Sequence, residues 1–340
     1  MMGFQEILGH ERQITFLSSA ARRGMVHHAY LFAGRPGIGR RTVALTFARA
    51  LNCERQNGDA CDVCASCRKI LAGTHPDVQI VGEDRSKPQI VIDDIREKII
   101  RFVSFKVFEG RMRVILLLDA ERMNNNTANA LLKTLEEPPG QTVFLLTTAN
   151  LNALLPTIRS RCQKVRFSPI DESRIADHLE QHHQMPPEQA RLLARLSEGS
   201  IGRALGLTPE QLTTRDTFLG AVLQLGTGPA HDPVTVAEQL AGDKNILTSQ
   251  LTLLESFLRD AAVLQLAPTA PLRNPDQADV LEKFAARLTV TAIHRLLGLV
   301  RDIRGAARLN INPQVALERL FLELAQAQKA VHGTTQSRSG

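Results

Sequence analysis

Short apolar runs alternate with helix-like stretches through the first half of the chain. Five of the runs favour β-structure and are predicted to be strands, at residues 29–33, 78–81, 114–118, 143–147 and 164–167. Helical patterns lie between them. In residues 92–105, for example, Ile95, Ile99 and Phe102 recur at the spacing of one buried helical face. Strands that alternate with helices predict an α/β fold, with a parallel sheet covered by helices on both faces.

The second half of the chain loses these runs, and its apolar pattern becomes helical. Short helical stretches at residues 171–183, 187–197 and 201–207 predict a small helical domain. Longer ones at 246–264, 277–288, 291–307 and 313–329 predict a helical bundle. We therefore expect an α/β domain at 1–168, a small helical domain at 169–208, an all-α bundle at 209–331 and a polar, disordered tail at 332–340.

The composition is that of an ordinary globular protein, with 43% hydrophobic and 22% charged residues among 340. The net charge of +6 fits work beside nucleic acid, but it fits a basic solvated surface equally well. With no Trp and one Tyr, the chain has fewer aromatic residues than a surface that stacks single-stranded bases usually needs. We find no leader pattern and no apolar run near the ~20 residues of a membrane span, so we expect a cytoplasmic protein without a membrane partner.

The first predicted strand leads into a glycine-rich turn and then into a helical stretch. The turn carries Gly34, Gly37 and Gly39, in the strand–loop–helix setting of the phosphate-binding motif G-x-x-x-x-G-K-[ST]. Backbone N–H groups of such a turn can converge on an anion at the start of a helix. Residues 34–42, called the phosphate-binding loop below, therefore predict a phosphate-binding architecture.

Two side chains on which ATP chemistry depends are replaced in this loop. Arg40 stands in place of the lysine that reaches the outer phosphates, and Arg41 in place of the hydroxyl residue that binds magnesium. Thr42 comes one residue too late to replace that hydroxyl. Guanidinium groups beside such a turn still attract anions, so weak nucleotide binding without hydrolysis stays open. We predict that ATP is not bound productively.

The strand predicted at 114–118 ends in Asp119, the position of a metal-holding aspartate in ATPases of this type. The next residue is Ala120, where an active enzyme has the glutamate that activates water. Glu121 lies one position further on, and a shift of one residue at a strand end turns a side chain to the opposite face. On the pattern alone, Asp119 is equally well explained as a helix cap after the strand.

Four of the five cysteines lie between residues 53 and 67. Cys53, Cys61, Cys64 and Cys67 form the pattern C-x7-C-x2-C-x2-C, which predicts a closed, tetrahedral site for a structural Zn²⁺ ion. An iron–sulfur cluster is the main alternative, but Cys67 is not followed by the C-x3-C-P continuation of a ferredoxin run. Cysteines without a metal are the other alternative. Such clustering does not resemble a secreted disulfide framework, which again indicates a reducing compartment.

Together these patterns resemble the AAA+ subunits of the bacterial DNA polymerase III clamp loader. The resemblance covers roughly residues 4–205, and its matching stretches are residues 34–42, 53–67, 74–77, 119–121, 128–139 and 160–162. The run Ala-Asn-Ala-Leu-Leu-Lys-Thr-Leu-Glu-Glu-Pro-Pro at 128–139 and Ser-Arg-Cys at 160–162 are highly specific to this family. The helical remainder agrees in length and class rather than by motif.

The resemblance also separates two branches of that family. The ATPase branch, gamma/tau, keeps the lysine, the hydroxyl and the Asp-Glu pair. The delta-prime branch commonly loses one or more of them and still supplies Ser-Arg-Cys to its neighbour. Arg40, Arg41 and Ala120 make this chain similar to the delta-prime branch. This implies an AAA+ domain with a zinc-binding insertion, a helical lid domain and a C-terminal collar bundle, without ATPase activity of its own.

Roles for single residues follow from the resemblance. Arg161 would be an arginine finger that reaches the phosphates of ATP bound to a neighbouring subunit, and Arg159 is the alternative assignment. Thr148 matches the sensor-1 position, Arg203 resembles the sensor-2 arginine, and Cys162 needs only to be small and buried. The degenerate nucleotide site would comprise Gly34, Gly37, Gly39, Arg40, Arg41, Thr42, Asp119, Thr148 and Arg203.

The partners implied are the gamma/tau and delta subunits, joined in an open ring through their helical bundles. The beta sliding clamp and primer–template DNA would be reached through the complex. Two other functions stay open. The chain could be a divergent gamma/tau-type ATPase in which Arg40, Thr42 and Glu121 replace the missing groups. The four cysteines could instead form a DNA-reading zinc finger, although few basic residues and no aromatic ones lie among them.

Overall fold

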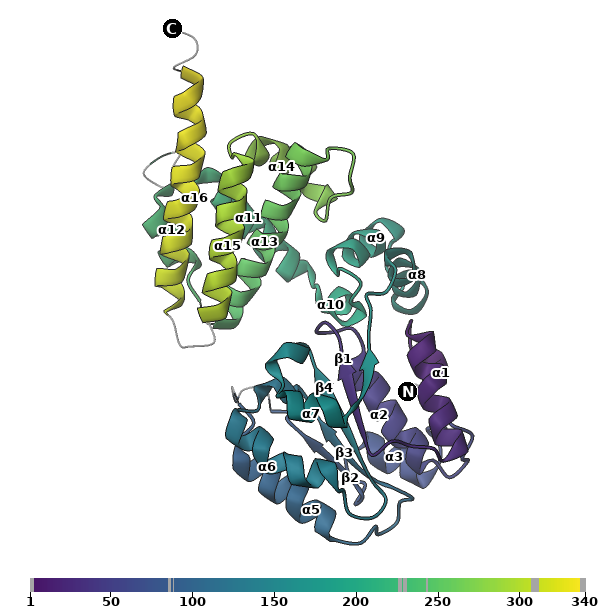
Figure 1. Cartoon of the computed structure of the whole chain (residues 1–340). Helices are drawn as coiled ribbons and strands as arrows, with labels where there is room; N and C mark the ends of the chain where they lie inside the picture. The colour runs from purple at the N-terminus through teal and green to yellow at the C-terminus, as the bar shows by residue number, and fades with distance from the viewer. Residues whose placement is uncertain are drawn as a thin grey trace. The chain divides into compact units, whose positions relative to one another are not determined.

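The computed structural model describes residues 3–84, 87, 89–225, 228, 231–242, 244–306 and 312–336. It divides into two compact units, Met1–Gly206 and Leu207–Gly340, which we describe separately (Figure 1). Among the described residues, no helix is both long enough and apolar enough to cross a membrane.

The first unit is built on a five-stranded parallel sheet with the strand order β2-β3-β4-β1-β5. The predicted sheet is confirmed, and the predicted strands match the observed ones to within a residue or so at each end. They are β1 (Ala29–Ala33), β2 (Val78–Val81), β3 (Arg113–Leu117), β4 (Thr142–Thr148) and β5 (Gln163–Arg166). Every residue of β1, β3 and β4 is buried, because parallel strands in the middle of a sheet are covered on both sides.

Helices pack on both faces of this sheet, as predicted (Figure 1). On one face, Phe32 of β1 and Leu116 of β3 belong to a core shared with α1 (Glu11–Arg23) and α2 (Arg40–Asn52). On the other, alternate strand residues pack against four helical segments. These segments are α4 (Ile92–Ile95), α5 (Arg101–Ser104), α6 (Asn125–Glu136) and α7 (Pro156–Arg161). Between α4 and α5 the helix widens into a π-helical stretch, Arg96–Ile100, which the sequence pattern did not indicate.

Five smaller elements of the first unit complete the connections. The cysteine-rich loop ends in the short helix α3 (Ala65–Leu71), which was not predicted. Short 3-10 turns lie at Phe4–Glu6, Ala120–Arg122 and Leu151–Ala153. Isolated pairing of Ile90 with Met123 ties the start of α4 to the turn that follows β3.

Three short helices end the first unit: α8 (Glu172–His183), α9 (Pro187–Leu196) and α10 (Ile201–Gly206). Their predicted bounds are accurate to one or two residues. Contacts divide the chain after Gly206, so these helices lie in the same compact unit as the sheet. A separate small helical domain at 169–208 stays a prediction.

The second unit is helical, as predicted, around a core that includes Phe218, Phe257, Phe284 and Phe321. Its helices are α11 (Pro209–Gln224), α12 (Pro233–Leu240), α13 (Lys244–Leu266), α14 (Ala278–Ala285), α15 (Val290–Ala306) and α16 (Pro313–Gln336), with a 3-10 turn at Pro275–Gln277. The helices α11 and α12 were not predicted. Helix α16 runs through Gln336, so it includes residues that we assigned to a disordered tail, while residues 337–340 lie outside the described part.

Candidate functional site

A pocket of about 410 Å³ opens where β1 and β3 end, at the carboxyl edge of the sheet. This is the edge at which ligands of parallel α/β sheets usually bind. Residues 37–42 of the phosphate-binding loop line the pocket. Apolar residues such as Leu8 and Leu205 and the polar residues Glu6, His178 and His183 also line it. Of the predicted site residues, the pocket is lined by Gly37, Gly39, Arg40, Arg41, Thr42 and Asp119.

Three predicted residues of this site do not line the pocket. Gly34 is packed so closely that a Cβ atom there would lie 2.8 Å from the Cβ of Phe167. Arg203 lies 3.9 Å from the carboxylate of Glu198. Thr148 is fully buried, and its Oγ1 accepts a hydrogen bond from the backbone N–H of Asn150 at 3.1 Å.

Of the two threonines that end β4, Thr147 rather than Thr148 lines the pocket. Its Oγ1 accepts the backbone N–H of Asp119 at 2.9 Å and so holds the end of β3 against β4. Successive side chains of a strand point to opposite faces, so Thr147 and Thr148 face different surroundings. The sensor-1 role of Thr148 stays a prediction.

Arg40 is almost completely buried, with 7% of its surface exposed, and its guanidinium lies 3.9 Å from the carboxylate of Asp119. The cation at the lysine position is therefore directed to the aspartate that, in an active site, would hold magnesium. Arg41 instead extends outward and forms an ion pair with Glu83 on the surface. Arg40 and Arg41 are thus each directed to a carboxylate of their own chain.

Glu121 is committed to the backbone of the same edge. Its Oε1 accepts a hydrogen bond from the N–H of Ala149 at 2.8 Å, just after β4 ends. Glu121 is not among the described residues that line the pocket. A carboxylate that caps the turn after β4 is poorly placed to activate a water above the phosphate-binding loop. This contact disfavours the alternative in which Glu121 replaces the missing base.

The backbone of the phosphate-binding loop accepts hydrogen bonds from the segment that begins α10. Gly202 donates its N–H to the carbonyl of Gly37 at 2.9 Å, and the hydroxyl of Ser200 donates to the carbonyl of Pro36 at 3.0 Å. Gly37 has a φ of 72°, and a Cβ atom there would lie 2.6 Å from the hydroxyl of Ser200. Only glycine fits this close approach, so its position also serves contact with the helical domain.

His10 fixes the loop from the other side, and sequence reasoning missed it. Its Nε2 lies 2.8 Å from the carbonyl of Ile38, and its ring packs edge-on against Phe167 with centroids 4.7 Å apart. Burial lowers the pKa of His10, so the neutral ring donates this hydrogen bond at neutral pH. No pattern in the sequence connects a histidine before α1 with this loop.

Arg161 is the last residue of α7 and lies at the amino end of β5, one of the two edge strands of the sheet. Its guanidinium forms an ion pair with Glu136 at the end of α6 and donates to the carbonyl of Thr157 at 2.9 Å. About a third of the side chain, 35%, is exposed. Next to it, burial raises the pKa of the Cys162 thiol to about 12, which fits an unreactive packing role.

The four clustered cysteines converge, so that their Sγ atoms all lie within 4.8 Å of one another. A tetrahedral ion with metal–sulfur bonds of about 2.3 Å needs sulfurs about 3.8 Å apart, which requires only a small contraction. Cys53 directly follows α2, Cys64 caps the start of α3, and the N–H of Cys67 donates to the Sγ of Cys64 at 3.4 Å. Burial raises the pKa of Cys53 and Cys67, so thiolates at these two positions need a compensating cation. At Cys61, burial is outweighed by hydrogen bonds from the backbone of Cys64 and Val63, which lower its pKa to about 7. The arrangement can hold a metal ion.

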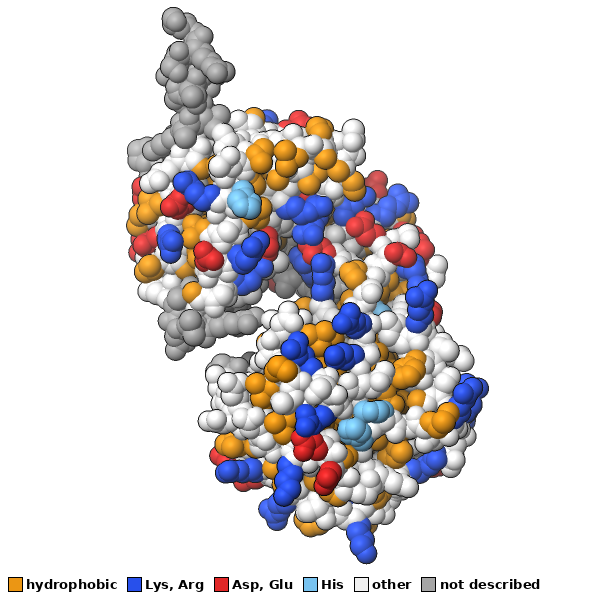
Figure 2. Space-filling model, viewed as in Figure 1, with side chains coloured by type: hydrophobic (Ala, Val, Ile, Leu, Met, Phe, Trp, Pro, Cys, Tyr) orange, Lys and Arg blue, Asp and Glu red, His pale blue; other side chains and the backbone are white. Residues whose placement is uncertain are grey.

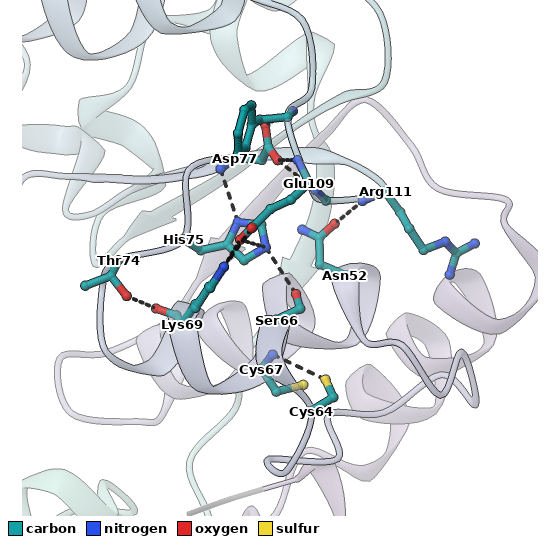
Figure 3. Close-up of polar contacts among 12 residues, drawn as sticks. Asn52, Cys64, Ser66, Cys67, Lys69, Thr74, His75, Asp77, Glu109 and Arg111 are labelled. Carbon is teal, nitrogen blue, oxygen red and sulfur yellow. Dashed lines mark hydrogen bonds and ion pairs between the residues drawn. The ribbon is translucent and has the colours of Figure 1, made fainter.

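The segment Thr74-His75-Pro76-Asp77 connects this cluster to the sheet (Figure 3). His75 accepts the N–H of Asp77 on Nδ1 at 3.1 Å, and its Nε2 lies 3.2 Å from the hydroxyl of Ser66 in α3. The carboxylate of Asp77 accepts three consecutive backbone N–H groups, those of Phe108, Glu109 and Gly110, at 2.7–2.8 Å. Burial alone raises the pKa of Asp77, but these donors outweigh it, and the pKa is lowered overall.

The net positive charge is not gathered in one stripe on the face shown in Figure 2. There, Lys and Arg side chains are interspersed with Asp and Glu over both units. Charge on that face therefore does not by itself mark a nucleic-acid site.

Two family models match the chain. One, described as DNA polymerase III, delta subunit, matches residues 9–171, and the other, its C-terminal part, matches residues 209–326. Among solved structures, a DNA polymerase III gamma subunit-related protein from Thermotoga maritima has a TM-score of 0.50 at 19% identity, over 93% of this chain and 99% of that one. At this identity the likeness supports the fold alone.

Two sequence relatives separate the branches. The tau subunit of DNA polymerase III from Escherichia coli is 36% identical over 220 residues, which are 63% of this chain but 33% of that protein. The first tau and gamma relatives are spanned over less than half of their length. The delta' subunit from Escherichia coli is 31% identical over 294 residues, which are 85% of each protein. The chain therefore belongs to the delta-prime (delta') family of DNA polymerase III subunits.

Proposed function

We propose that this chain is the non-hydrolysing subunit of a clamp loader and that it supplies Arg161 to ATP held by a neighbouring subunit. The observation that carries the proposal is the contrast between two arginines. Arg40 is buried beside Asp119 in the chain's own pocket, whereas Arg161 is partly exposed at an edge of the sheet. A planar, permanently charged guanidinium at an edge can cross an interface and bind phosphate oxygens through two N–H groups.

The partners in this proposal are gamma/tau ATPase subunits and a delta subunit, held together through the helical second unit. ATP binding by the neighbours would shape the complex to hold the beta sliding clamp open on primer–template DNA. Hydrolysis, assisted by Arg161, would release the clamp. The whole assembly would work on the bacterial chromosome in the cytoplasm.

The ion proposed for the four cysteines is Zn²⁺. Four sulfur ligands suit zinc and leave no coordination position for water, so the ion would stabilise the fold rather than take part in catalysis. The cysteine-rich loop follows α2, the helix that begins at Arg40 of the pocket. The cysteines themselves do not line the pocket. A purified sample should therefore contain one zinc per chain.

The function is tested by Arg161→Ala in the reconstituted complex. We expect normal assembly and a loss of DNA-stimulated ATP turnover of ~10³-fold at the adjoining site, as for other arginine fingers. Arg159→Ala is the matched control, because this residue lies on the same helix and its guanidinium faces Asn152 instead. Unchanged turnover with Arg161→Ala, or an equal loss with Arg159→Ala, would refute the assignment.

The divergent-ATPase alternative is tested on the chain alone. With Arg40 against Asp119 and Glu121 bonded to the backbone of Ala149, we expect no magnesium-dependent ATP hydrolysis by the pure protein. Turnover that follows the protein through purification would favour the alternative.

A further inference from the structure

The guanidinium of Arg161 has a partner within its own chain. Glu136, the last residue of α6, forms an ion pair with Nη2 of Arg161, while the carbonyl of Thr157 accepts a hydrogen bond from Nη1 at 2.9 Å. The hydroxyl of Ser160 lies 3.4 Å from the same Nη1. These contacts fold the side chain back over the ends of α6 and α7.

Both sides of the ion pair are accessible to water, with 35% of the Arg161 side chain and 43% of the Glu136 side chain exposed. An ion pair with this exposure shifts an equilibrium by no more than about fivefold. A triphosphate carries more negative charge than one carboxylate and offers its oxygens in a geometry that a guanidinium fork matches. The contact with Glu136 is therefore strong enough to hold Arg161 in the free chain and weak enough for phosphate to displace it.

Once Arg161 turned toward a neighbour's nucleotide, the carboxylate of Glu136 would lose its partner. This cost opposes the engagement of Arg161, and it does not act on chemistry after Arg161 is engaged. The opposition should consequently appear in the concentration of ATP required rather than in the maximal rate.

We infer that Glu136 is a positioning residue that holds Arg161 in a self-paired state and sets the threshold at which a neighbour's ATP captures it. The inference rests on the proposed role of Arg161 and adds its regulation. The carboxylate of Glu136 would then determine how readily Arg161 joins the ATP site of the adjoining subunit.

The experiment uses the reconstituted complex with Glu136→Gln, which keeps the shape of the side chain and removes its charge. We expect KM for ATP at the adjoining site to fall by about threefold to fivefold, with kcat unchanged. Glu137→Gln is the matched control, because it removes the same charge at the next, exposed position and leaves the pair with Glu136 intact. A decrease in kcat, or an unchanged KM, would overturn the inference.

The same substitution in an Arg161→Ala background separates this inference from the proposed function. If Glu136 acts through Arg161, Glu136→Gln changes nothing in that background, whereas direct repulsion of ATP by Glu136 would still lower KM and overturn the inference. If Arg161→Ala itself leaves turnover intact, the proposed function fails instead.

A measurement on the free chain needs no partner subunit. Phenylglyoxal modifies accessible guanidinium groups, and peptide mapping would give the rate at Arg161. Glu136→Gln should raise that rate by about threefold or more while Glu137→Gln does not. Equal rates in all three proteins would contradict the self-paired state.

Discussion

The pocket around Arg40 and the sheet edge around Arg161 both contain an arginine, but the two arginines have different roles. At the pocket, the guanidinium is buried and directed to Asp119, so the cation serves its own chain. At the edge, Arg161 ends a short helix beside an edge strand and is held by groups that water also reaches. Burial and partner, rather than residue type, thus decide whether an arginine stabilises the fold or remains available to another molecule.

The sharpest way to break this comparison is to make the same conservative change at both places. Arg161→Lys keeps the charge but loses the planar fork, so we expect ATP turnover of the complex to fall by more than ~10²-fold. Arg40→Lys should leave turnover of the complex within about twofold. Similar effects at the two positions, measured by DNA-stimulated phosphate release, would show that the two arginines are not functionally distinct.

Removing the metal tests a third region, the cysteine cluster. This cluster should affect stability, but it contributes no residue to the Arg40–Asp119 pair or to the Arg161–Glu136 pair. Because the binding energy of a structural ion is largely folding energy, chelation should lower the free energy of unfolding of the isolated chain by at least ~3 kcal/mol. Thermal unfolding with metal analysis of the same sample measures this. Cys162→Ala is the control, since Cys162 lies outside the cluster and should not change metal content. Unaltered stability after complete metal loss would argue against a structural ion.

Stability should also distinguish the two arginines. Here the larger effect is expected at Arg40, whereas the larger effect on ATP turnover is expected at Arg161. Arg40→Ala removes a buried side chain and leaves Asp119 without its cation, so we expect a loss of about 1–3 kcal/mol in the free energy of unfolding. Arg161→Ala should cost no more than ~0.5 kcal/mol, because the side chain is partly solvated. Urea unfolding measures both, and Arg41→Ala, at an exposed pair beside the first site, provides the control. A larger loss at Arg161 would reverse the comparison.

The smallest expected effect concerns Asp77 and depends on pH. Its pKa is lowered in the folded chain, so its contribution to stability is complete above the unfolded pKa of about 3.9 and is lost as pH falls through the folded value. Asp77→Asn should therefore destabilise by about 1–2 kcal/mol at pH 7 and by less near pH 3. Urea titrations at both pH values would check this, and a difference that does not shrink in acid would exclude a role for the carboxylate charge.

The sequence was sufficient for the features that depend on local pattern. The buried strands, the four converging cysteines and the altered loop at Arg40 and Arg41 are all where the pattern predicts them. The helix α11 was missed, although Thr208 and Gln211 form a capping box with Pro209 at its first position, which is a recognisable start signal.

Other features depend on contacts between distant residues and could not be inferred from one chain. Thr147 rather than Thr148 faces the pocket because of strand register, and His10 meets Ile38 across 28 positions. The role of the segment at 74–77 also depends on contacts that are distant in sequence, since Asp77 accepts hydrogen bonds from N–H groups more than thirty residues later. A motif can mark such residues, but only packing shows which group each one serves.

The chain has a single tyrosine and no tryptophan, and that tyrosine is Tyr30 in β1, with 1% of its surface exposed. Its ring packs edge-on against Phe47 at 5.2 Å, and its hydroxyl accepts the N–H of His27 at 3.0 Å. Tyrosine emission from this protein therefore comes from β1 of the sheet, and the helical second unit contributes none of it. Spectroscopists accordingly have an unlabelled optical probe that reports melting of the first unit alone, in every variant that keeps Tyr30.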